Sequence, residues 1–237
     1  MIHRNFNNLI LDAVKQGDQI GGPYELAKIF SKSLEFNNGF KENDLRNRYL
    51  NWWRGDAFDT GPTYASVFNK VNRGMEPKLV VKKVHEDFGF NTAGCGPAHR
   101  ATPLAGFINI TTDKLVSLAR QEAKITHYDD DAGNGSAIVI LLCRYLIEGE
   151  SWEKAKSLVS LNPDLHKSWE KVKNGKLSPD GYIFNVIHSA IYFIDQNKSL
   201  SESIQFSGKA NYSAILFSVI ANLLKSIQKL SSNNISK

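Results

Sequence analysis

The chain has 237 residues, of which 42% are hydrophobic and 22% are charged, and these proportions exclude a disordered chain and a coiled coil. This length suits one domain with a sizeable core. Cys95 and Cys143 are too few for a disulfide scaffold, so we expect a reducing, cytoplasmic environment. The net charge of +5 comes without a dense cluster of Lys and Arg interleaved with aromatic residues, so we expect no nucleic-acid partner.

No segment predicts export or membrane insertion. Residues 1–11 carry three asparagines where the apolar part of a secretory signal would lie. The longest apolar run, Ala137–Leu142, continues to Ile147 only across Arg144. That run is short of the roughly 20 residues that a membrane-spanning helix needs. We therefore expect no membrane association.

Apolar residues recur mostly at helical spacing, and the alternation typical of strands is scarce. The pattern predicts helices, in chain order, over Asn8–Val14, Tyr24–Leu34, Leu45–Trp53, Thr63–Arg73, Thr112–Ile125, Ser136–Glu148, Glu150–Ser160, Gly181–Asp195 and Tyr212–Leu230. The segment Ser136–Glu148 is apolar almost all round, which predicts a buried central helix. We expect one compact all-α bundle over residues 1–230 and a flexible tail over residues 231–237.

Four connecting segments combine glycines with polar residues beside a predicted helix. They are Gly17–Gly22, Gly55–Pro62, Gly94–Pro97 and Asp129–Gly135. Glycine lets backbone N–H groups approach a ligand, and helix N-termini favour anions. Carboxylates in such places bind hard cations or act as general bases. Taken one at a time, each segment is explained better by turns and helix caps.

The order of the motifs resembles that of the ADP-ribosylglycohydrolase family. Gly17-Asp-Gln-Ile-Gly-Gly-Pro-Tyr-Glu25 is similar to the family's opening motif, in which Gly-Asp-x-x-Gly leads to a glutamate. The later segments that carry the resemblance are Trp53–Thr63, Gly94–Leu104, Thr126–Ala137 and Gly181–Ala190. The resemblance implies the family's compact all-α bundle and its activity, the hydrolysis of the bond that joins ADP-ribose to a protein side chain.

The resemblance also implies a reaction centre. The family holds two magnesium or manganese ions that orient the ribose hydroxyls, and the glutamate matching Glu25 helps to activate the attacking water. Asp59 best matches the acidic metal loop, and Asp56 is the other acid in register. The family pattern there is a threonine and two adjacent aspartates, whereas Ala57 and Phe58 separate these two. Glu25 and Asp59 are the expected catalytic residues.

On the ligand side, the resemblance implies a cleft that holds ADP-ribose. The expected substrate-binding residues are Thr92, Gly94, Cys95, Gly96, His127, Asn134 and Lys209. Cys95 replaces the family's asparagine, and a thiol is a poor substitute for an amide that donates and accepts hydrogen bonds. His99 stands in the place of a methionine, and we expect it to be a packed histidine.

The largest departure from the family is the segment Ser207–Ser213, which occupies the place of a Gly-Gly-Asp-Thr-Asp-Thr metal motif. Lys209 and Asn211 stand where two ligating aspartates are expected. An ammonium group cannot coordinate a cation, so we expect Lys209 to pair with Asp59 or Asp56 and to replace a metal ion electrostatically. The remaining metal ligands would be Asp56, Asp59 and Asn211, which provide for one Mg²⁺ at most and not for two metals.

The expected function is that of an ADP-ribosylglycohydrolase-like hydrolase with a degenerate metal site. It would bind ADP-ribose, free or on a protein, and cleave an N- or O-glycosidic bond to it. The alternative is a catalytically inactive regulatory module that binds ADP-ribose or a nucleotide. Lys209, Cys95 and His99 favour the inactive module. Glu25, Asp59 and His127 favour the enzyme.

Overall fold

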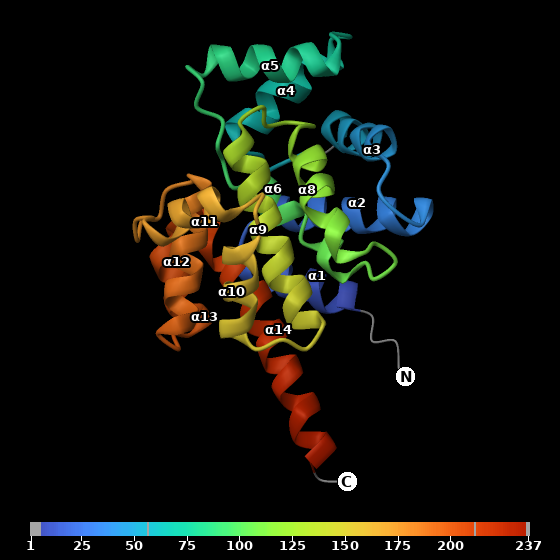
Figure 1. Cartoon of the computed structure of the whole chain (residues 1–237). Coiled ribbons are helices and arrows are strands. Elements are labelled where there is room, and N and C mark those ends of the chain that lie inside the picture. The colour runs from blue at the N-terminus through green and yellow to red at the C-terminus, as the bar shows by residue number, and fades with distance from the viewer. Residues whose placement is uncertain (1–5, 56, 211, 236–237) are drawn as a thin grey trace.

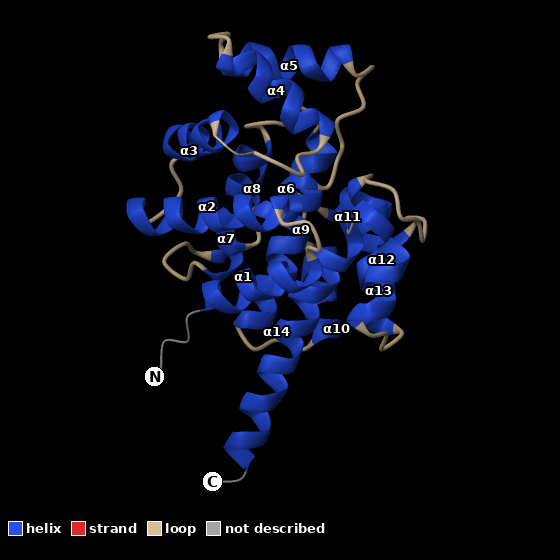
Figure 2. Cartoon of the chain, turned by 180° about the vertical axis from the view of Figure 1, so that it is seen from behind, coloured by secondary structure: helices blue, strands red, loops and turns tan. Residues whose placement is uncertain are grey.

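The computed structural model describes residues 6–55, 57–210 and 212–235. These residues form helices and connecting loops, and no strand occurs among them (Figure 2). The elements are α1 (Phe6–Gly17), α2 (Gly22–Asn37), α3 (Glu42–Arg54), α4 (Pro62–Asn72), α5 (Pro77–Asp87), α6 (Gly96–Arg100), α7 (Pro103–Gly106), η1 (Thr112–Lys114), α8 (Leu115–Ala123), α9 (Asp130–Ile147), α10 (Trp152–Leu161), α11 (His166–Lys173), α12 (Ile183–Asp195), α13 (Leu200–Ser207), η2 (Gly208–Ala210) and α14 (Tyr212–Ile235). The predicted all-α fold is confirmed.

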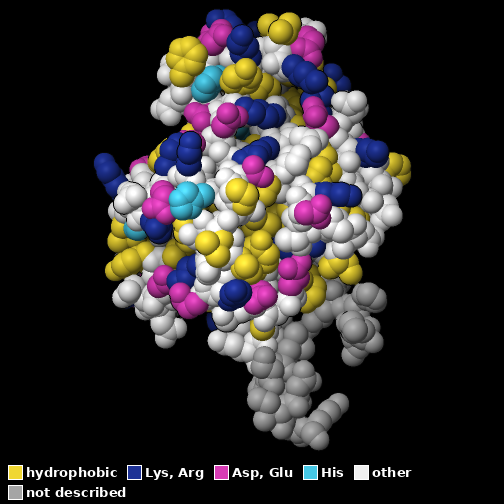
Figure 3. Space-filling view, in the orientation of Figure 1, with side chains coloured by type: hydrophobic (Ala, Val, Ile, Leu, Met, Phe, Trp, Pro, Cys, Tyr) yellow, Lys and Arg dark blue, Asp and Glu magenta, His cyan; other side chains and the backbone are white. Residues whose placement is uncertain are grey.

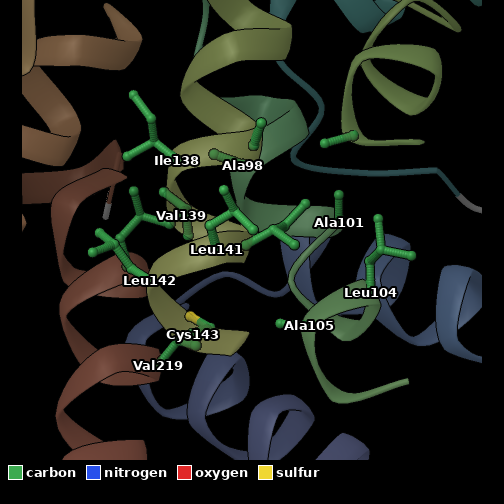
Figure 4. Close-up of a cluster of buried hydrophobic side chains, with 14 of the residues drawn as sticks. Ala98, Ala101, Leu104, Ala105, Ile138, Val139, Leu141, Leu142, Cys143 and Val219 are labelled. Carbon is green, nitrogen blue, oxygen red and sulfur yellow. The ribbon is translucent and has the colours of Figure 1, made fainter. Parts of the chain in front are cut away.

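Helix α9 is the centre of the bundle, as predicted (Figure 1). It packs against α6, α7, α8, α10, α12 and α14. Its side chains Ile138, Val139, Leu141 and Leu142 meet apolar residues of the neighbouring helices in one core (Figure 4). A Cβ added at Gly135 would lie 2.2 Å from Cγ1 of Ile183, so the absence of a side chain there lets α12 approach α9 closely.

Helix α9 begins earlier than predicted, and this corrects one of the expected loops. The segment Asp129–Gly135 was expected to be a loop before a helix at Ser136, but α9 starts at Asp130. The Asp129 carboxylate accepts the N–H of Asp131 and caps the helix. Most of the polar segment therefore forms the first turns of a buried helix.

Five further α-helices were not predicted: α5, α6, α7, α11 and α13. Each is short, with 11, 5, 4, 8 and 8 residues respectively. Because a short helix contains few apolar residues, the helical spacing of these residues is hard to recognise in the sequence. Helix α5 forms a hairpin with α4 (Figure 1), and a small valine cluster between them is separate from the main core.

Helix α14 packs against α1, so the first and last helices of the described chain lie side by side. It runs to Ile235, beyond the predicted end at Leu230. None of the helices in the described ranges is long and apolar enough to cross a membrane. On the face seen in Figure 3, basic and acidic side chains are interspersed. This face lacks the continuous basic surface that favours nucleic-acid binding.

Candidate active site

A cavity of about 560 Å³ opens where several glycine-containing segments meet. Its walls come from residues 59–64 after α3, residues 91–96 before and at the start of α6, residues 180–182 before α12, and Tyr212 at the start of α14. His99, Arg100 and His127 also border it. Segments far apart in the sequence therefore surround one space.

Two backbone hydrogen bonds join two segments of the cavity wall that are far apart in the sequence. The N–H of Cys95 donates to the carbonyl oxygen of Gly181 at 3.1 Å, and the N–H of Ile183 donates to that of Ala93 at 3.0 Å. Residues 93–95 and 181–183 thus lie side by side. Thr92, Gly94, Cys95 and Gly96, all predicted to bind substrate, border the cavity.

Asp59 borders the cavity and lies against the start of α2. Its Oδ2 accepts the N–H of Gly22 at 3.2 Å, and a Cβ added at Gly22 would lie 2.4 Å from the backbone oxygen of Asp59. Burial raises the pKa of the Asp59 carboxyl above its usual value; the N–H of Gly22 opposes this rise, and the negative charge of Asp18 adds to it. A carboxyl group in this state is a stronger base than an exposed one once it is ionised.

Asp18 holds the loop before α2 in shape. Its Oδ1 accepts the N–H of Gly21 at 2.8 Å, and its Oδ2 accepts that of Tyr24 at 2.9 Å. This aspartate is buried, and its carboxylate satisfies backbone groups at the helix start. The Gly-Asp-x-x-Gly motif therefore builds the turn that brings Gly22 to Asp59.

Glu25, the predicted catalytic glutamate, does not border the cavity. Pro23 and Leu26 of the same helix do. The Glu25 carboxylate pairs with the ammonium group of Lys28 at 2.6 Å, one turn along the half-exposed side of α2. Asp59 thus borders the cavity and Glu25 does not.

His127 and His99 are both buried and both border the cavity. Nδ1 of His127 lies 2.7 Å from Oγ1 of Thr126; burial, and then the charge of Arg100, holds the pKa of His127 well below its usual value. Nε2 of His99 donates to the carbonyl oxygen of Tyr212 at 2.9 Å, and burial lowers the pKa of His99 to about 4. Both rings are therefore neutral at pH 7.

Cys95 is a packed thiol in the cavity wall. It is 3% exposed, and burial raises its pKa to about 12. The thiol is therefore protonated at neutral pH and is not an activated nucleophile. This agrees with its expected place as a small residue of the cleft.

Asn134 and Lys209 do not border the cavity, although both were predicted to bind substrate. Because α9 begins at Asp130, Asn134 falls on the side of the helix that meets α8, and its Oδ1 accepts Nε–H of Arg120 at 2.8 Å. Lys209 is exposed, and no ion pair between it and Asp59 occurs in the part of the chain that the structure describes. The expected pairing with Asp59 is not found, and the alternative pairing with Asp56 stays a prediction because Asp56 lies outside the described residues.

The predicted metal ligands are only partly within the described residues. Asp56 and Asn211, two of the three predicted ligands, lie outside the described residues. Among the residues that are described, no three His, Cys, Asp or Glu side chains are grouped so that they could hold a metal ion. Asp59 contributes one carboxylate, and one of its oxygens already accepts a backbone N–H. The prediction of a single Mg²⁺ stays a prediction.

A buried ion pair that was not predicted lies beside the cavity. Nε of Arg100 lies 2.6 Å from Oε1 of Glu122, and these side chains are 1% and 0% exposed. Tyr49 donates its hydroxyl to the same carboxylate oxygen at 3.0 Å. The one signal in the sequence was that Arg100 belongs to the Gly94–Leu104 motif.

A second hollow of about 420 Å³ lies between α3, α5 and α8. Basic side chains border it, but Arg46 pairs with Glu42 and Lys124 pairs with Asp130. None of the described residues with a predicted role borders this hollow. The first cavity is therefore the candidate active site.

The comparisons with known proteins agree with this fold. A solved structure described as an "ADP-ribosylglycohydrolase-related protein complex" superimposes with a TM-score of 0.72 at 18% identity, over 94% of this chain and 88% of that chain. At this identity the likeness shows the fold. No curated protein matches the sequence. The sequence model of the ADP-ribosylglycohydrolase family matches residues 17–217, and the chain belongs to this family of hydrolases.

Proposed function

We propose that the cavity binds ADP-ribose attached to a protein side chain and that the protein hydrolyses the N- or O-glycosidic bond between them. The observation that carries the proposal is the convergence of Asp59, His127 and residues 92–96 on one cavity. Its volume of about 560 Å³ falls within the range of pockets that enclose small ligands. Family membership supports the same class of reaction.

The ligand-binding part of the proposal relies on hydrogen-bond donors. Gly94 and Gly96 leave the backbone of the cavity wall accessible, so N–H groups there can approach phosphate oxygens. The neutral imidazole of His127 adds a side-chain group at the same wall, whereas the hydroxyl of Thr92 is already hydrogen-bonded to Nδ1 of His85 at 2.7 Å. ADP-ribose offers oxygen acceptors on its phosphates and riboses, so its chemistry matches this wall.

The reaction part of the proposal assigns general-base catalysis to Asp59. In this scheme the Asp59 carboxylate takes a proton from water as the water oxygen bonds to the anomeric carbon of the ribose. The bond from that carbon to the side-chain nitrogen or oxygen breaks. The leaving atom takes a proton from solvent, and Asp59 releases the proton that it took from water. The products are ADP-ribose and the unmodified side chain. No step of this scheme runs through a metal ion.

A second candidate function is a regulatory module that binds ADP-ribose without turning it over. The observation that favours it is the place of Glu25, which lies off the cavity and is paired with Lys28. In this alternative the cavity keeps its binding wall but lacks the family's catalytic glutamate.

An assay of ADP-ribose release distinguishes the two candidates. The protein is mixed with an ADP-ribosylated protein in magnesium or in EDTA, and the melting temperature is measured with free ADP-ribose. Hydrolysis predicts release that falls about 100-fold or more in Asp59→Asn, as expected for loss of a general base, and that persists in the control Glu25→Gln. A rise in melting temperature without release supports the binding module. If the protein shows no release of ADP-ribose and no shift in melting temperature, both candidate functions are contradicted.

A further inference from the structure

The hydroxyl of Thr126 lies between a buried guanidinium group and a cavity histidine. Nη2 of Arg100 is 2.8 Å from Oγ1 of Thr126, and Nδ1 of His127 is 2.7 Å from the same oxygen. Thr126 is 0% exposed and His127 is 5% exposed. The three groups therefore form a hydrogen-bonded chain that is closed to solvent on the Thr126 side.

The direction of each hydrogen bond in this chain follows from the donors available. A guanidinium group can only donate, so Oγ1 of Thr126 accepts from Arg100. The Thr126 hydroxyl has one proton, and Nδ1 of His127 is its one acceptor among the described residues. If Nδ1 carried a proton instead, the buried hydroxyl proton would have no acceptor, which is costly. Nδ1 therefore accepts, and the ring proton is on Nε2.

Arg100 is itself fixed in place. Its Nε lies 2.6 Å from Oε1 of Glu122, and its guanidinium carbon lies 5.4 Å from the centre of the Tyr49 ring. The hydroxyl of Tyr49 donates to the same carboxylate oxygen of Glu122. A charged donor held on several sides keeps the Thr126 hydroxyl turned toward His127.

The other edge of the His127 ring faces the cavity wall. A Cβ added at Gly94 would lie 3.3 Å from Nε2 of His127, so the glycine leaves this nitrogen uncovered by a side chain. We propose that Arg100 and Thr126 are positioning residues that fix His127 as its Nε2–H tautomer, so that the ring presents a hydrogen-bond donor to the ligand. The identity of that ligand rests on the proposed function.

This arrangement restricts what can bind beside His127. A donor at Nε2 pairs with an oxygen acceptor of the ligand, such as a phosphate or ribose oxygen, and repels another N–H. A histidine of the other tautomer would select for donors instead. The chain from Glu122 to His127 thus sets the polarity of one wall of the cavity.

Nitrogen NMR of the histidines tests the tautomer without any ligand. The probe is ¹⁵N-histidine-labelled protein, with the His127 signals assigned from a His127→Gln spectrum. In the wild type and in Thr126→Ser, which keeps the hydroxyl, the proton is expected on Nε2. In Thr126→Val, which replaces the hydroxyl with a methyl group, a measurable share of the Nδ1–H form is expected.

Two results of that experiment overturn the proposal. They are a wild-type His127 with its proton on Nδ1, and a Thr126→Val spectrum with the wild-type tautomer. If Thr126→Val does not fold, the wild-type and Thr126→Ser spectra decide the matter.

Binding of ADP-ribose then tests the consequence for the ligand. Affinity is expected to fall about 3- to 10-fold in Thr126→Val, the size of one net hydrogen bond, and to return in Thr126→Ser. A change of the His127 tautomer that leaves the affinity for ADP-ribose unaltered would overturn the role of this tautomer in ligand binding. A wild type with the Nε2–H tautomer that does not bind ADP-ribose contradicts the proposed function and leaves the positioning of His127 supported.

Discussion

The carboxylate of Asp59 accepts the backbone N–H of Gly22 at 3.2 Å, and this contact joins the loop after α3 to the first turn of α2. The two residues are far apart in sequence, and the Asp59 backbone adopts a left-handed conformation with φ of 49°. A non-glycine residue rarely adopts that conformation without surrounding support. The close packing of Asp59 against Gly22 provides this support.

Gly22→Ala is expected to damage this contact. The added Cβ would lie 2.4 Å from the Asp59 backbone oxygen, so one of the two segments must move. We expect a loss of about 1–3 kcal/mol in the free energy of unfolding, measured in urea. The control is Gly61→Ala, because a Cβ at Gly61 meets no atom within 4 Å. Equal stability of the two variants would show that Gly22 is not tightly packed against Asp59.

The raised pKa of Asp59 predicts a pH dependence of stability. Because the pKa is higher in the folded state than in the unfolded chain, the contribution of Asp59 is full below about pH 4, the usual pKa of an aspartate, and is lost as pH rises through the folded value. Wild-type protein should therefore lose stability relative to Asp59→Asn between pH 4 and pH 7. Urea unfolding across that range measures this, and a constant difference between the proteins would contradict it.

The same pKa shift predicts how ADP-ribose release depends on pH. A general base acts when it is ionised, so release should decline on acidification at a higher pH than an unperturbed aspartate would cause. Initial rates between pH 4 and pH 8 measure the decline. A rate that stays level down to pH 4 would exclude Asp59 as the base.

Glu122→Gln tests the buried ion pair beside the cavity. It leaves the Arg100 guanidinium, which is 1% exposed, without its carboxylate partner. Breaking a buried pair in this way costs about 3–5 kcal/mol in the free energy of unfolding. Glu153→Gln is the matched control, because its pair with Lys156 involves a carboxylate that is 81% exposed and should contribute about 1 kcal/mol or less. Similar urea midpoints for the two variants would refute the importance of the buried pair.

Lys209→Ala tests the hypothesis that this lysine replaces a metal ion. The side chain is exposed and forms no ion pair with Asp59 in the described structure, so the free energy of unfolding should change by about 0.5 kcal/mol or less. The melting temperature and the affinity for ADP-ribose provide the measurements. A marked loss of either would restore the electrostatic role expected from the sequence.

Much of the fold could be predicted because helix-forming segments repeat their apolar residues with a period that can be read directly. Helix α9 is buried on nearly all sides, and its sequence is apolar nearly all round. The short helices α5, α11 and α13 contain too few apolar residues for a helical period to be recognised in the sequence. Their place depends on packing against segments distant in the sequence.

The candidate site could be predicted in part for a similar reason. Asp59, Thr92 and His127 lie in motifs whose order indicated one shared cavity, and they border one. The direction in which the Glu25 side chain points depends on the rotation of α2 about its axis and on the ion pair between Glu25 and Lys28. A sequence motif specifies neither of these. The pair of Arg100 and Glu122 joins two different helices, so no local pattern reveals it.

A crystal structure of the protein with ADP-ribose would show whether this cavity is the ligand site. We expect the ligand in the cavity of about 560 Å³, with a ribose beside Asp59 and an oxygen atom within hydrogen-bonding distance of Nε2 of His127. ADP-ribose bound beside Glu25 and Lys28, or in the second hollow between α3, α5 and α8, would contradict it.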